Sequence, residues 1–332
     1  MLARRIASVF IVLGVVVLSA CTSDAEHNPA SGDSTGSSSV ELRVGQINTS
    51  LQSLLEAADV LSELPYSIRW NSFFSGPEAI EAQNADSIDI AYMADTPPIF
   101  AQAAGVPVSI VAVTKAPNGA QNIAVLVNQQ SPIDDAEGLR GKRVAVVPGT
   151  ITQFLLVRVL ADAQIPLDEV ESVTLQAPDA MTALRRGDVD AAILVDPSAA
   201  AAVHAHKARV LLTGEGLVSG SNVFVATHAA LEHSGKEVAI GDLLKRVKSA
   251  LTWAQQHPEP WAEIYGEVNR LPVAVARDAV VRTATELVPI DRDRIADQQQ
   301  QADAFRRLGL ISSDLDVRAM FDQRYNELLF GE

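Results

Sequence analysis

The sequence predicts an α/β protein built from two lobes of similar topology. Three observations support this prediction. Strand-like runs alternate with helical patterns from residue 40 onward, many runs are β-branched and apolar on both faces, and part of the pattern recurs 101 residues later. Strands that are apolar on both faces are typical of parallel sheets covered by helices. At 332 residues the chain is long enough for two lobes with separate cores.

The first twenty residues have the pattern of a secretory signal peptide. Arg4 and Arg5 form a basic region, and residues 6–20 carry no charge. This run is shorter than the ~20 apolar residues that a bilayer crossing requires. The following Leu18-Ser19-Ala20-Cys21 resembles the lipobox of bacterial lipoproteins, with the only cysteine of the chain. The resemblance implies cleavage before Cys21 and acyl chains on its sulfur, which would hold the protein on the extracytoplasmic face of the cell membrane. The alternative is an uncleaved anchor with an incidental cysteine.

Residues 21–39 are expected to be a flexible tether behind the lipidated Cys21. The segment 22–39 is rich in Ser, Gly and Asp and has no large apolar residue. Such a segment cannot bury enough surface to offset the entropy lost on ordering.

The strands are predicted from short apolar runs, and the helices between them from wider apolar spacing. The strand-like runs are 40–46, 66–71, 87–93, 108–114, 123–128, 142–147, 170–175, 190–195, 209–213 and 222–227. The helical patterns are 51–64, 152–163 and 179–187, followed from residue 241 by 241–256, 273–285, 292–308 and 315–329.

An internal comparison supports two lobes of the same topology. At an offset of 101 residues, 77–95 aligns with 178–196, and 43–49 aligns with 144–150. A chance match of two helix–turn–strand units is the alternative interpretation. We expect lobe I over 40–115, lobe II over 116–221, and a return to lobe I with the C-terminal helices over 222–332.

Composition and motifs argue against several classes of function. The formal charge is −15, or −17 without Arg4 and Arg5, and aromatic residues are 5% of the chain. Such a surface repels phosphate backbones, so no nucleic-acid partner is expected. No dinucleotide, P-loop or nucleophile-elbow motif is present, and the pair His204 and His206 has no partner at metal-ligand spacing. We expect no enzyme activity, cofactor or metal.

Five short polar turns carry the functional prediction, because each lies between a predicted strand and a predicted helix. The turns are 46–50, 73–78, 93–98, 148–153 and 195–199, and none contains a basic residue. Helix N-termini present unpaired N–H groups and a partial positive charge, so several of them around one cleft can hold an anion without Lys or Arg. A neutral ligand, or simple helix capping, would explain the same residues.

The stretch 75–105, SGPEAIEAQNADSIDIAYMADTPPIFAQAAG, is similar to the aliphatic sulfonate, nitrate and taurine class of substrate-binding proteins of bacterial ABC importers. Residues 139–160 resemble the family's entry strand and ligand loop of lobe II, and 195–198 resemble its Asp-Pro turn. The segment 45–49 lacks the aromatic residue and lysine of the family's first turn. The resemblance spans about 40–230, and its departures lie in ligand turns.

The resemblance implies a periplasmic-binding-protein fold of type II, with two α/β lobes and a ligand cleft between them. We expect a lipid-anchored receptor that captures a small anionic or zwitterionic organic solute, best an aliphatic sulfonate, and delivers it to ABC permease and ATPase subunits. The residues expected to bind the ligand are Asn48, Thr49, Ser75, Asp95, Thr96, Gly149, Thr150, Thr152 and Asp196. Nitrate, taurine and a thiamine-type pyrimidine precursor are alternative ligands. An enzyme on the same fold and a ligand-sensing lipoprotein are alternative functions.

Overall fold

The computed structural model describes residues 40–47, 50–116, 120–205 and 207–331. Two β-sheets form the framework, and both belong to one compact unit, Ser39–Glu332. The signal peptide, Cys21, the tether, Asn48 and Thr49 lie outside the described residues.

The first sheet has six strands and defines lobe I. Its order is β11 (Glu286–Val288), β4 (Val108–Lys115), β10 (Ser221–Thr227), β3 (Ile90–Ala94), β1 (Glu41–Ile47) and β2 (Ser67–Phe73). Strand β1 pairs in parallel with β2 and β3, whereas β10 is antiparallel to β3 and β4.

The second sheet has five strands and defines lobe II. Its order is β7 (Glu171–Thr174), β6 (Arg143–Val146), β8 (Ala191–Val195), β5 (Ile123–Asn128) and β9 (Ala208–Thr213). Strand β6 is parallel to β7 and β8, and β5 is antiparallel to β8 and β9. The two sheets therefore share one topology, and both are mixed. The expectation of parallel sheets holds for β1, β2 and β3 and for β6, β7 and β8 but was wrong for β5 and β10, because each of these follows a connection from the other lobe and enters its sheet reversed.

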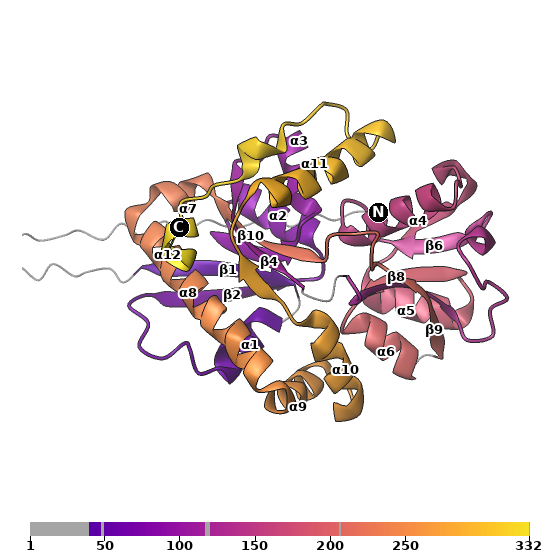
Figure 1. Cartoon of the computed structure of the whole chain (residues 1–332), viewed down its shortest axis with the longest axis horizontal. Helices are drawn as coiled ribbons and strands as arrows, with labels where there is room; N and C mark the ends of the chain where they lie inside the picture. Colours follow the sequence, from indigo (N-terminus) through magenta and orange to yellow (C-terminus); the bar gives the residue numbers. More distant parts are fainter. Residues whose placement is uncertain (1–39, 48–49, 117–119, 206, 332) are drawn as a thin grey trace, which may run out of the picture. The chain divides into compact units, whose positions relative to one another are not determined.

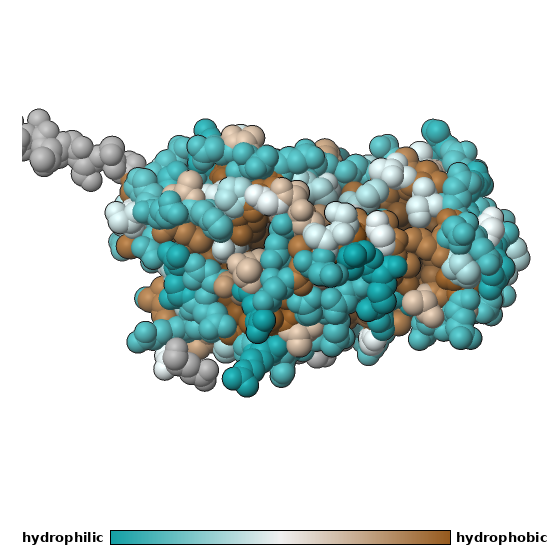
Figure 2. Space-filling view, turned by 90° about the horizontal axis from the view of Figure 1, so that it is seen from above, coloured by the Kyte–Doolittle hydropathy of each residue, from teal (hydrophilic) through white to brown (hydrophobic). Residues whose placement is uncertain are grey.

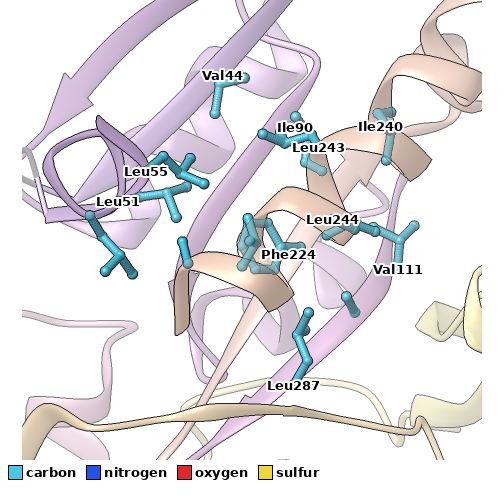
Figure 3. Packing of buried hydrophobic residues seen from close by; sticks show 14 of the residues in the cluster. Val44, Leu51, Leu55, Ile90, Val111, Phe224, Ile240, Leu243, Leu244 and Leu287 are labelled. Carbon is cyan, nitrogen blue, oxygen red and sulfur yellow. The ribbon is translucent and has the colours of Figure 1, made fainter. Parts of the chain in front are cut away.

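Helices cover both faces of each sheet (Figure 1). In lobe I, α2 (Gly76–Asn84), α3 (Pro97–Ala103) and α11 (Arg292–Arg307) pack on one face, whereas α1 (Ser50–Ala57), α8 (Ser234–Gln256), α9 (Pro258–Asn269) and α10 (Val273–Thr283) pack on the other. In lobe II, α4 (Ile151–Asp162) lies opposite α5 (Ala177–Arg186) and α6 (Ser198–Ala205). Figure 3 shows one of these interfaces, where Leu51 and Leu55 of α1 and Leu243 and Leu244 of α8 surround Phe224 of β10.

The remaining elements are short. They are α7 (His228–Glu232), α12 (Asn326–Phe330) and the 3-10 turns Glu137–Leu139, Leu167–Glu169 and Val317–Met320. None of the helices in the described part of the chain combines the length and hydropathy that a bilayer crossing requires. On the face shown in Figure 2, hydrophilic residues cover most of the surface and hydrophobic residues appear between them.

The ten predicted strands are present, whereas some helix limits were wrong. Helix α1 ends at Ala57 rather than 64, because the chain turns through Asp59, which has a φ of 51°. The helix expected over 315–329 is interrupted, because Phe321 bridges to Ile110 of β4. Helix α9, which begins with a proline, and strand β11 were not predicted.

The internal repeat is structural, because an equivalent Arg–Asp pair joins two strands in each lobe. The offset of 101 residues holds for Asp89 and Asp190, but it was wrong by one residue for the first strand, because Arg43 corresponds to Arg143 and not to Val144. In lobe I the Asp89 carboxylate accepts hydrogen bonds from the backbone N–H and side chain of Arg43, while the Asp89 N–H donates to the Arg43 carbonyl. In lobe II Asp190 and Arg143 make the same contacts between backbone and side chain.

The two pairs differ in burial. The Asp89 side chain is 2% exposed and also accepts a hydrogen bond from Lys236, whereas that of Asp190 is 33% exposed. Burial raises the pKa of Asp89, but hydrogen bonds from Arg43 and Lys236 outweigh it, and the pKa is lowered overall.

We predict that Asp89→Ala lowers the free energy of unfolding by about 3–5 kcal/mol, because it leaves two partly buried cations without their shared carboxylate. Asp190→Ala is the matched control in lobe II, and we expect a loss of about 1 kcal/mol because its ion pair is solvated. Urea denaturation measures both values, and equal losses would contradict the difference in burial.

Candidate functional site

A cavity of about 480 Å³ lies where residues of both lobes meet. Each of the five polar turns contributes to its wall, through Ile47 and Ser50, Ser75 and Gly76, Ala94 and Pro97, Thr150 to Thr152, and Asp196 and Ser198. The turns meet because each follows the carboxyl end of a strand, the edge at which α/β sheets bind ligands. The volume is typical of a small-molecule site.

The structure brings four of the predicted ligand-binding residues to this cavity. Ser75, Thr150, Thr152 and Asp196 line it. Asp95, Thr96 and Gly149 are not among the lining residues, although each is adjacent in sequence to one or more that are. The part of each residue in ligand binding stays a prediction.

The N-terminus of α4 is capped by neutral groups. The Thr150 hydroxyl donates to the Val147 carbonyl and accepts from the N–H of Thr152, and the two threonine hydroxyls lie 2.8 Å apart. The N–H of Gly149, whose φ is 71°, donates to the side chain of Gln153. Since neutral groups make these contacts, the partial positive charge of the helix end is not neutralised locally. The N–H of Ile151, the first helical residue, has no intrahelical acceptor.

The N-terminus of α2, by contrast, is capped by a carboxylate of its own. Glu78 accepts hydrogen bonds from the N–H of Phe74 and the hydroxyl of Ser75. It also accepts from the side chain of Gln176 in lobe II. The Ser75 hydroxyl is therefore already engaged as a donor, and Glu78 supplies the negative charge that this helix end favours.

Asp196 forms an ion pair at the cavity wall. Its Oδ2 accepts from Nε of Arg282 on α10 at 2.8 Å, and its Oδ1 accepts from the N–H of Ala200 on α6. The Asp196 side chain is 1% exposed. Burial raises its pKa, while the hydrogen bond and charge of Arg282 act in the opposite direction. Asp196 thus caps α6 and joins it to α10.

Asp95 lies beside the cavity in a buried polar cluster. Its carboxylate accepts from the Ser219 hydroxyl at 2.5 Å and from the Gln301 amide at 3.4 Å, and its carbonyl accepts from Gln298. Burial raises the pKa of Asp95 to about 6, against the hydrogen bonds from Ser219 and Gln301. The neighbouring Thr96 is fully buried, and its hydroxyl has no hydrogen-bond partner among the described residues.

Sequence reasoning missed several polar residues in the wall. Asn122 precedes β5 and Asn222 lies in β10, so both stand where the chain passes between the lobes. Gln176 precedes α5 and also reaches Glu78. The predicted lobe limits, after residues 115 and 221, were the available signal for the asparagines, because segments that connect two lobes border the cleft between them. Pro117, Asn118 and Gly119 lie outside the described residues.

The larger part of the wall is apolar, and helices of lobe I contribute several of its residues. Its members include Leu54 of α1, Val247, Leu251 and Ala254 of α8, Trp261 of α9, and Val280 and Val281 of α10. The sequence placed the helices now seen as α8 and α10 in lobe I without a part in the cavity, because apolar spacing does not distinguish core from cavity wall, and it did not predict α9.

The cavity has an unusual charge balance. Of the described residues that line it, none is Lys or Arg, and Asp196 is the only carboxylate. No group of three or more His, Cys, Asp or Glu side chains in the described ranges is placed to hold a metal ion.

We predict that Asp95→Asn stabilises the fold at neutral pH but not at about pH 4. A carboxyl pKa near 6 in the folded state, above the ordinary 3.8, means that the folded chain binds the proton more tightly. The contribution of the Asp95 carboxyl to the free energy of unfolding is therefore greatest below about pH 4. It falls by about 2–3 kcal/mol as the pH rises through the folded pKa near 6.

Thermal or urea unfolding between about pH 4 and 7 measures this difference. Asp297→Asn is the control, because Asp297 contributes only a weaker repulsion and its side chain is 43% exposed. A less stable Asp95→Asn variant at pH 7 would contradict the assignment.

Comparison with known proteins places the chain in an established group. A protein of Escherichia coli (strain K12) named as an aliphatic sulfonates-binding protein is 31% identical over 286 residues, 85% of this chain and 88% of that protein. A Bacillus subtilis (strain 168) protein of the same name is 29% identical over 90% of each chain.

Solved structures give the same result. The alkanesulfonate-binding protein of Xanthomonas axonopodis pv. citri, solved with bound MOPS, has a TM-score of 0.79 and 28% identity over 85% of this chain and 98% of its own. A desulfurization enzyme shares the fold alone, at 15% identity and a TM-score of 0.62 over 88% of this chain and 99% of its own. Residues 75–260 match the family described as NMT1/THI5 like, and the chain belongs to this family.

Proposed function

We propose that this chain is the solute-binding subunit of an ABC importer and that it captures a small organic sulfonate. The observation that carries the proposal is that Thr150 and Ile151, at the neutrally capped N-terminus of α4, line a cavity whose described lining residues include no Lys or Arg. A sulfonate suits such a site because its single charge is spread over three oxygens that accept hydrogen bonds.

The relatives support the same class of ligand. Proteins named for aliphatic sulfonates or alkanesulfonates cover most of this chain, and one of them was solved with MOPS, which is a sulfonate. The apolar part of the cavity wall favours an organic sulfonate over an inorganic anion such as nitrate, because an inorganic anion would leave that wall in contact with water.

Taurine fits less well, because its ammonium group requires an acceptor. Asp196, the carboxylate among the described lining residues, already accepts hydrogen bonds from Arg282 and Ala200. A pyrimidine precursor would be neutral or cationic and would leave the α4 N-terminus without an anionic partner.

The enzyme alternative has little support at the cavity. Among the described residues, Ser109 and His228 form a serine–histidine pair, 3.1 Å apart. Both lie at the opposite edge of the lobe I sheet, where β4 begins and β10 ends, and neither lines the cavity. A ligand held at α4 would not contact this pair.

The proposed importer also needs a location and partners. We infer that residues 1–20 direct export, that Cys21 is lipidated, and that 21–39 tether the binding unit to the extracytoplasmic face of the membrane. The basic region, the apolar run and the lipobox-like Leu18-Ser19-Ala20-Cys21 support this inference. Permease and ATPase subunits on other chains would receive the ligand.

We predict that Cys21→Ser moves the protein from the membrane fraction to the soluble extracytoplasmic fraction, because serine cannot take the thioether-linked acyl chains. Fractionation of cells, followed by immunoblotting, measures the shift. Ser23→Ala in the tether is the control, and it should leave the protein with the membrane. Membrane retention of Cys21→Ser would contradict lipid anchoring.

We predict that butanesulfonate binds the wild-type chain and that Ile151→Pro weakens this binding about tenfold or more. Proline removes one N–H that a sulfonate would contact, and a hydrogen bond to a charged group contributes about 1.5–3 kcal/mol. Proline is favoured at the first helical position, and Thr150, with φ −122° and ψ 171°, has the extended backbone that a following proline requires.

The matched control is Ile151→Ala, which loses a similar amount of side chain but keeps the N–H. Isothermal titration calorimetry measures both affinities, and thermal unfolding without ligand verifies that both variants fold. Equal affinities of the two variants would remove the α4 N–H from the site, and no binding of any sulfonate to the wild-type chain would reject the proposed function.

A further inference from the structure

The cavity is much larger than a sulfonate head group requires. Its volume is about 480 Å³, whereas a single water needs about 10–15 Å³ of such space. A head group held at Thr150 and Ile151 would occupy a small part of this volume and leave the rest for the remainder of the ligand.

That remaining space has apolar walls from four helices. We call it the tail chamber and define it by Leu54 of α1, Val247, Leu251 and Ala254 of α8, Trp261 of α9 and Val280 of α10. Leu54, Val247, Trp261 and Val280 also belong to the main hydrophobic core of lobe I. Figure 3 shows neighbouring side chains of this core, such as Leu51 and Leu244, packed between α1, α8 and the sheet. Because core packing holds these walls, they cannot collapse freely onto a short ligand.

We propose that the tail chamber selects sulfonates with long apolar tails, of about six to ten carbons, over short-chain sulfonates. This inference rests on the proposed function, because it assumes a sulfonate at the α4 N-terminus. Each methylene that leaves water for an apolar wall can raise the affinity up to about fourfold, the factor that corresponds to about 0.8 kcal/mol. A chain of one or two carbons leaves the chamber filled with water.

Ala254 determines how much of the chamber is open. It is the smallest residue of the set and is partly buried against the lobe I core. A larger side chain at this position would occupy space that the tail needs, while the α4 N-terminus, on the other lobe, would be unchanged.

Titration of the full mature chain with ethanesulfonate and octanesulfonate tests the proposal. We expect octanesulfonate to bind at least about tenfold more tightly to the wild-type chain. Ala254→Leu should weaken octanesulfonate at least about tenfold and change ethanesulfonate less than about threefold. Thr252→Leu is the matched control, since Thr252 is exposed on the same helix and does not line the cavity, and it should change neither affinity.

The other outcomes overturn the inference, and they show whether chain-length selection or the proposed function has failed. Equal binding of the two sulfonates to the wild-type chain, or an equal loss of both in Ala254→Leu, overturns chain-length selection but leaves the proposed function standing. No binding of either sulfonate to the wild-type chain overturns the proposed function and this inference with it. If Ala254→Leu does not fold, Val281→Phe replaces it, because Val281 lines the cavity and is 57% exposed, and the same selective loss is required.

Discussion

An anion in this cavity must be held by backbone dipoles and neutral side chains, because no lysine or arginine of the described chain lines the wall. The affinity of such a site for an anion depends on the direction of the N–H dipoles and on the exclusion of water rather than on formal charge. Both lobes must therefore present their helix ends to the same space. The repeated topology achieves this, since every turn that borders the cavity follows the carboxyl end of a strand in one of two similar sheets.

The contacts between the lobes hold this arrangement through groups other than the N–H groups at the start of α4. Arg282 of α10 reaches Asp196 after β8, and Gln176 of lobe II reaches Glu78 of α2. Phe154 of α4 packs against Phe305 of α11, with ring centroids 5.4 Å apart. The aromatic contact lies on the same helix that presents its N-terminus to the cavity. Packing of α4 against lobe I thus fixes the orientation of the N–H groups proposed to bind the ligand.

The sequence was sufficient to predict the strands and the positions of the five turns, because both depend on local patterns of apolar and turn-forming residues. It was not sufficient to predict β11, a strand of three residues, or the reversed direction of β5 and β10, which depends on pairing between distant segments. The polar wall residues Asn122 and Asn222 were missed because only their position at the predicted lobe limits distinguishes them from other asparagines near turns. Asp95 was placed correctly at the end of β3, but its partner Gln301 is 206 residues away, so its burial in a polar cluster had no local signal.

The geometry also separates helix ends that the sequence treated alike. Ser75 and Thr150 both precede helices and both line the cavity. At α2, however, the carboxylate of Glu78 accepts from the backbone and from Ser75, so the charge that the helix dipole favours is already supplied by the chain. At α6 the carboxylate of Asp196 plays the same part for the N–H of Ala200. A bound anion at the N-terminus of α2 or α6 would lie close to a carboxylate. Helix α4, by contrast, is capped by neutral hydroxyl and amide groups. Of these three helix ends, electrostatics therefore favours α4 for the anionic head group of the proposed ligand.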